Sequence, residues 1–146
     1  MSTDLHPDYP VVAGEYVLTK GWRLNLREQF NRRIDDDSLV LWRPELTFWI
    51  NIWNNDGPAS ADEVLARLLA DASPERSDEK VEKTQTVSRL SYELAEDDTE
   101  RDESSGKSIN GFIIYPKGYA QIAAYFDSAE ARALAYEIIA SVRSDN

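Results

Sequence analysis

Apolar and polar positions alternate along the central stretch 39–53, LVLWRPELTFWINIW. A period of two that includes aromatic and β-branched residues is typical of β-strands. Pro44 interrupts the pattern, and its fixed φ suits the first central position of a tight turn, so we predict a hairpin of two strands. A turn of either two or four residues pairs Leu41 with Phe48.

This register divides the side chains of the hairpin between two apolar faces. One face is aliphatic apart from Phe48, and the other carries three tryptophans, Trp42, Trp49 and Trp53. A sheet that is apolar on both faces must be covered twice or must use its second face for a partner. The tryptophan side is therefore a candidate binding surface.

Two helices, four further strands and one short strand candidate are expected around the hairpin. A capping box, Ser60 to Glu63, opens a helix that ends near Ala72, and Asp127 to Glu130 opens the last helix in the same way. The short candidate is Glu15–Leu18, and the further strands are expected at Trp22–Leu26, Thr84–Leu94, Ile109–Tyr115 and Tyr119–Phe126.

The last two of these strands flank Pro116-Lys-Gly118 and form a second hairpin. A three-residue loop places Phe112 on the face of Ile122, and puts three tyrosines, Tyr115, Tyr119 and Tyr125, on the other face. A four-residue loop changes this assignment, because a slip of one residue turns every side chain to the opposite face. With the three-residue loop, the tyrosines join the tryptophans on one surface, which is expected on the side of the sheet opposite the helices.

The remaining segments read as an arm and three polar loops. Residues 1–14 form an extended arm, and 28–38, 73–83 and 96–106 are charged connections. We predict one domain over residues 1–146, of the α+β class: a six-stranded antiparallel sheet with two helices packed on one face. The order along the chain is three strands, a helix, three strands and a helix.

Composition narrows the classes of function. The net charge is −11, which disfavours binding to nucleic acid and favours a positively charged protein partner. The chain has no cysteine, so it has neither a disulfide framework nor a thiolate metal site. We see no signal peptide and no apolar run near the roughly 20 residues of a membrane span, and expect a cytoplasmic protein.

No set of residues forms a recognisable catalytic motif. The lone histidine, His6, lies in the arm, and no nucleophile motif accompanies it. The run Asp35 to Asp37 lacks the spacing of a calcium loop and is interpreted as a solvated loop. We therefore expect no catalytic residue, metal or cofactor. The acidic residues Glu96, Asp97 and Asp98 are candidates for contact with a basic partner.

The chain resembles the PsbP-like superfamily, which includes the Ran-binding import factor. The resemblance rests on Gly21-Trp22, the tryptophan-rich hairpin, the Ser-x-x-Glu helix start, the closing hairpin and the final Ala140-Ser-Val-Arg143. Some bacterial members of that superfamily act beside toxins, as effector chaperones or immunity proteins. The resemblance implies an α+β fold and a protein-binding role, and carries over no functional residue.

These observations lead to one main hypothesis and several alternatives. The main one is a non-enzymatic, acidic protein that binds a cognate bacterial toxin or effector, as an immunity protein or a secretion chaperone. Alternatives are a homodimer through the aromatic side, a small-ligand binder that uses it, a structural domain, and an enzyme that uses paired carboxylates. The proposed contact residues are Trp42, Trp49, Trp53, Tyr115, Tyr119, Tyr125, Glu96, Asp97 and Asp98.

Overall fold

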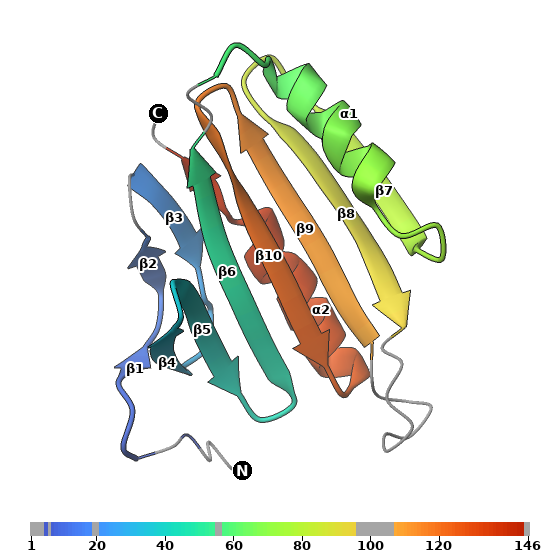
Figure 1. Cartoon of the computed structure of the whole chain (residues 1–146). Coiled ribbons are helices and arrows are strands. Elements are labelled where there is room, and N and C mark those ends of the chain that lie inside the picture. The colour runs from blue at the N-terminus through green and yellow to red at the C-terminus, as the bar shows by residue number, and fades with distance from the viewer. Residues whose placement is uncertain (1–4, 6, 19–20, 55–56, 96–106, 145–146) are drawn as a thin grey trace.

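The computed structural model describes residues 5, 7–18, 21–54, 57–95 and 107–144. Strands make up most of this part of the chain (Figure 1). The elements in order are β1 (Val11–Val12), β2 (Glu15–Val17), β3 (Trp22–Asn25), β4 (Phe30–Asp35), β5 (Ser38–Arg43), β6 (Leu46–Asn54), α1 (Ala61–Asp71), β7 (Ser77–Lys83), β8 (Ser88–Ala95), β9 (Lys107–Tyr115), β10 (Gly118–Phe126), α2 (Ala129–Ala140) and β11 (Arg143–Ser144).

These strands form two antiparallel sheets. The large sheet has eight strands in the order β1-β4-β5-β6-β10-β9-β8-β7, and the small sheet has three in the order β11-β3-β2. The central hairpin has the predicted register: Leu41 lies opposite Phe48, and Val40 lies opposite Trp49. The turn has two residues, and Glu45 has a positive φ of 70°.

The predicted fold class is wrong in two respects. The large sheet has eight strands rather than six, and a second sheet of three strands accompanies it. The two helices also lie on opposite faces of the large sheet, with α1 in front and α2 behind in Figure 1. Helix α1 contacts β8 and β9, whereas α2 contacts β10, β6, β9 and β3. We call the two sides the α1 face and the α2 face.

The loop of the second hairpin explains the error about the helices. Tyr115 pairs with Gly118, so the loop has two residues, and Phe112 lies opposite Gln121 rather than on the face of Ile122. Phe112 and its neighbour Ile114 therefore pack under α1. The three-residue loop, from which the faces were assigned, has the opposite parity and sent these side chains to the wrong face, whereas the four-residue alternative has the parity of the observed loop.

Two strands form where the sequence suggested polar connections. In β4, Phe30 is fully buried, and a tight turn through Asp36 and Asp37 joins this strand to β5. Both aspartates have positive φ values, 51° and 72°, a conformation that aspartate tolerates better than most residues. At the other end of the sheet, every side chain of β7 is exposed, and the pairing with β8 is irregular between Ser77 and Lys80.

The helix starts follow the predicted capping chemistry. Ser60 accepts a hydrogen bond from the Glu63 amide at 3.2 Å. In α2 the cap is Ser128, one residue later than expected, and it accepts from the Ala131 amide at 3.1 Å. Helix α2 lies so close to β9 that a Cβ added at Gly111 would be 3.0 Å from the Ile139 side chain. This packing fixes α2 across the middle of the sheet.

Candidate functional site

Five of the six predicted aromatic contact residues share the α1 face. Trp53 lies opposite Tyr119 on the neighbouring strand β10, and Trp49 lies opposite Ala123. The alternation along β5, β6 and β10 brings Trp42 and Tyr125 to the same side. We call this surface the aromatic face; its members are Trp42, Trp49, Trp53, Tyr119 and Tyr125.

Tyr115 does not belong to the aromatic face. It points to the α2 face, where its ring meets the edge of Trp22 at a centroid distance of 5.3 Å. Because Trp22 is almost completely buried, Tyr115 packs against the core cluster on the α2 side. The sequence put it among the contact residues only because of the incorrect loop length.

Neither helix covers most of the aromatic face, although Tyr119 packs against the apolar cluster under α1. Helix α1 lies over the neighbouring strands β8 and β9, and the front of β6 and β10 is free of helices in Figure 1. Trp53 keeps 48% of its surface exposed and donates its indole N–H to Gln121 Oε1 at 3.1 Å. Trp42 and Trp49 are half-buried. The prediction that the aromatic side has no helix at all is wrong, since α1 shares it, but the aromatic strands remain open.

Two neighbours partly shield Trp42 from opposite sides. The edge of its ring meets Tyr9 of the N-terminal arm, at a centroid distance of 5.0 Å. The guanidinium of Arg33 lies 4.9 Å from the centre of the Trp42 ring and 5.8 Å from that of Trp49. The buried amide of Asn31 donates to the carbonyl of Tyr9 at 3.2 Å, which fastens the arm here. The arm therefore reaches Trp42 and leaves Trp53 open.

The acidic candidates Glu96, Asp97 and Asp98 lie outside the described residues, as does His6. Asp35, Asp36 and Asp37 end β4 and form its turn, rather than the loop that the sequence suggested. Asp35 pairs with Arg33 at 3.6 Å. The positive φ values of this hairpin turn explain why aspartates occur here, so these residues need no role in binding.

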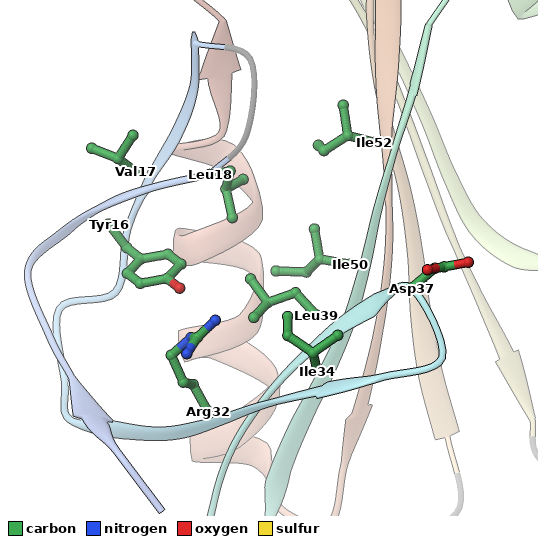
Figure 2. A pocket seen from close by; sticks show the side chains of 9 residues that line it. All are labelled: Tyr16, Val17, Leu18, Arg32, Ile34, Asp37, Leu39, Ile50 and Ile52. Atoms are coloured by element: carbon green, nitrogen blue, oxygen red, sulfur yellow. The ribbon is translucent and has the colours of Figure 1, made fainter.

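A cavity of about 460 Å³ opens on the α2 face, between β2 and strands β4, β5 and β6 (Figure 2). Most of its wall is aliphatic, and the lining residues are Tyr16, Val17, Leu18, Arg32, Ile34, Asp37, Leu39, Ile50 and Ile52. The aromatic face lies on the other side of the sheet. The small-ligand hypothesis from the sequence placed a pocket between the N-terminal arm and the tryptophans. This cavity does not lie there.

Arg32 is the cavity residue that sequence reasoning missed. Its Nε atom is buried and has no hydrogen-bond partner in the described part of the chain. In Figure 2 its guanidinium points toward the Tyr16 ring across the cavity. The sequence does contain a signal for this residue, because the alternation of Phe30, Arg32 and Ile34 places a cation between two apolar side chains on one face of a strand. The signal was missed because residues 28–38 were interpreted as a loop.

A second polar cluster, also unforeseen, joins α2 to β8. Glu93 is 3% exposed, and its Oε2 accepts hydrogen bonds from Arg132 Nε at 3.0 Å, Arg132 Nη2 at 2.5 Å and Tyr136 Oη at 2.5 Å. Burial by itself raises the pKa of Glu93, but the hydrogen bonds from Arg132 and Tyr136 and the nearby positive charges outweigh it and hold the pKa below its ordinary value. Burial, followed by the hydrogen bond to Glu93, raises the pKa of Tyr136.

This arrangement favours a structural role for the cluster. The Oε2 atom of the ionised carboxylate already accepts three hydrogen bonds, and a tyrosine with a raised pKa is a poor base. Because all three side chains hold one another, they fasten α2 to the sheet.

Comparison of the chain with protein-family models, with curated proteins and with solved structures found no match. The resemblance to the PsbP-like superfamily thus stays a prediction. Among the described residues, neither helix is long and apolar enough to cross a membrane. The described side chains also contain no group of three or more histidines, aspartates or glutamates placed to hold a metal ion.

Proposed function

We propose that the chain is a non-enzymatic protein-binding module that contacts a cognate bacterial toxin or effector through the aromatic face, as an immunity protein or a secretion chaperone. The observation that carries the proposal is the row of five rings on adjacent strands β5, β6 and β10, on a part of the sheet that neither helix covers. Tryptophan and tyrosine are the residues most enriched at the energetic centres of protein interfaces.

The charge of the chain favours a basic partner. A net charge of −11 accelerates association with a positively charged protein and repels other acidic surfaces. Arg33 already lies over the rings of Trp42 and Trp49. Trp53, exposed at the end of β6, offers a further ring on which an arginine or lysine of the partner could stack.

Affinity capture with matched surface variants tests this proposal. The tagged full chain is used to recover partners from a lysate of the source organism, in parallel with Trp53→Arg and Val81→Arg. Val81 is similarly exposed, at 42% against 48% for Trp53, but it lies on the edge strand β7. We expect the wild type and Val81→Arg to recover the same protein in stoichiometric amount, and Trp53→Arg to lose it.

Two results would overturn the proposal. One is the absence of any stoichiometric partner of the wild type; the other is a partner that Trp53→Arg retains in full. A homodimer through the aromatic face would appear instead as a dimer of the purified wild type in size-exclusion chromatography that Trp53→Arg converts to a monomer. Partner binding should also weaken as salt is raised, because exposed charges are screened over about 10 Å at 0.1 M ionic strength.

A further inference from the structure

The cavity on the α2 face has a wall suited to a small apolar body. Leu18 approaches from the segment after β2, Leu39 lies on β5, and Ile50 and Ile52 lie on β6. In Figure 2 their side chains lie around a common space. A volume of about 460 Å³ lies within the range of small-molecule sites, roughly 300–1,000 Å³. An alkyl chain fits such a wall, because burial of apolar surface is favourable there.

One end of this space carries two polar side chains, Arg32 and Tyr16, and one buried donor atom that the described residues do not satisfy. Arg32 makes no side-chain hydrogen bond or ion pair with the described residues, and its Nε is buried. Tyr16 lines the same end of the cavity, and in Figure 2 the two side chains point toward one another. Leaving a buried donor unpaired is unfavourable, so the arrangement calls for an acceptor.

We propose that this cavity binds a small aliphatic carboxylate, with Arg32 and Tyr16 holding its head group and the leucine and isoleucine side chains enclosing its alkyl chain. The planar guanidinium offers two parallel donors to a carboxylate, and the hydroxyl supplies a third. Asp37 also borders the cavity, but its carboxylate points away from Arg32 in Figure 2, so it does not occupy the place of an acceptor. This site lies on the face opposite the aromatic face, and the proposal does not depend on the proposed function.

Isothermal titration calorimetry of the full chain with octanoate, octanol and octylamine tests the proposal. The three probes share an alkyl chain and differ in the head group, so their order of affinity reports on Arg32. We expect saturable one-to-one binding of octanoate, binding of octanol weaker by tenfold or more, and no measurable binding of octylamine.

Two neighbouring arginines provide a matched pair of variants. Arg32→Met should weaken octanoate binding by roughly tenfold to a hundredfold, because a hydrogen-bonded charge is lost. Arg33→Met, one residue along on the opposite face, should leave it unchanged. Tyr16→Phe removes only the hydroxyl and should weaken binding by several-fold, and it decides the question if Arg32→Met fails to fold.

The thermal midpoint without probe gives a second readout. We expect Arg32→Met to unfold at the same temperature as the wild type or higher, since the buried donor that it removes has no partner. Octanoate should raise the midpoint of the wild type and of Arg33→Met equally, that of Tyr16→Phe by less, and that of Arg32→Met least. Equal binding of the three probes, undiminished octanoate binding by Arg32→Met or Tyr16→Phe, or no saturable binding by the wild type would overturn the proposal.

Discussion

Replacing Glu93 with glutamine should destabilise the protein by about 2 kcal/mol, since hydrogen bonds to a charged group are worth more than neutral ones. The carboxylate is buried and receives all of its hydrogen bonds from α2, through Arg132 and Tyr136. A glutamine has nearly the same shape and can place its oxygen where Glu93 Oε2 lies. Glu93→Gln therefore removes the negative charge with little change in packing.

The magnitude follows from the difference between charged and neutral hydrogen bonds. A bond to a charged group contributes about 1.5–3 kcal/mol and a neutral one about 0.5–1.5 kcal/mol, so the Tyr136 bond, which becomes neutral, loses about 1 kcal/mol. The two Arg132 bonds keep one charged member and lose the attraction of the opposite charge, which adds about 1 kcal/mol. The Arg132 side chain is 42% exposed, however, and water compensates part of its lost partner. We therefore expect a decrease in the free energy of unfolding of about 1.5–2.5 kcal/mol.

Urea denaturation at a series of pH values measures this decrease. The pKa of Glu93 is lower in the folded chain than its ordinary value of 4.5. The ionised carboxylate therefore stabilises the fold fully above the pKa of the unfolded chain, and the stabilisation is lost as the pH falls through the lower, folded pKa. The difference between wild type and Glu93→Gln should be constant near pH 7 and should shrink below about pH 4.5.

Asp78 provides a control on the same arginine. Its carboxylate lies 3.6 Å from Arg132 Nη2, but its side chain is 57% exposed. Asp78→Asn should cost less than about 0.5 kcal/mol, because exposed ion pairs contribute little. If Glu93→Gln costs no more than Asp78→Asn at pH 7, or if its cost does not diminish in acid, the reasoning about the buried cluster is refuted.

Two further predictions concern the central hairpin and the arm. Glu45→Gly should increase the free energy of unfolding by up to about 1 kcal/mol in urea titrations, because Glu45 has a φ of 70° and glycine adopts this conformation without strain; a decrease would contradict this explanation. Tyr9→Ala should increase the acrylamide quenching of tryptophan fluorescence by uncovering one edge of Trp42, whereas Arg27→Ala, which changes an exposed side chain that pairs with Glu137, should not. Unchanged quenching in Tyr9→Ala would mean that the arm does not shield the ring in solution.

The central hairpin could be predicted from the sequence because two independent signals agree there. The alternation in β6 and the position of Pro44 both lead to the pairing of Leu41 with Phe48, whichever of the two turn lengths is used. The start of α1 was equally accessible, since the hydrogen bond at Ser60 is local. In both places the determining interactions lie within a few residues of one another.

The packing of the two helices on opposite faces of the sheet could not be predicted from such local signals. Phe112 and Ile114 are apolar on one side of β9, and Ile113 is apolar on the other, so the pattern alone does not show which side meets which helix. The choice depended on the loop at Pro116, where one residue reverses all the faces. The cavity was even harder to predict from the sequence, because Tyr16 and Arg32 line the same space only after β2 folds over the α2 face.

The charged edge strand β7 has a consequence for how other chains can approach this protein. An unpaired strand edge is a template for a further strand, either from a partner peptide or from a second copy in an aggregate. Here the sequence of the edge is Ser-Asp-Glu-Lys-Val-Glu-Lys, its side chains are all exposed, and its pairing is bent near Asp78, where φ is 52°. Strand addition is therefore disfavoured at this border, which protects this side of the large sheet against edge-to-edge association.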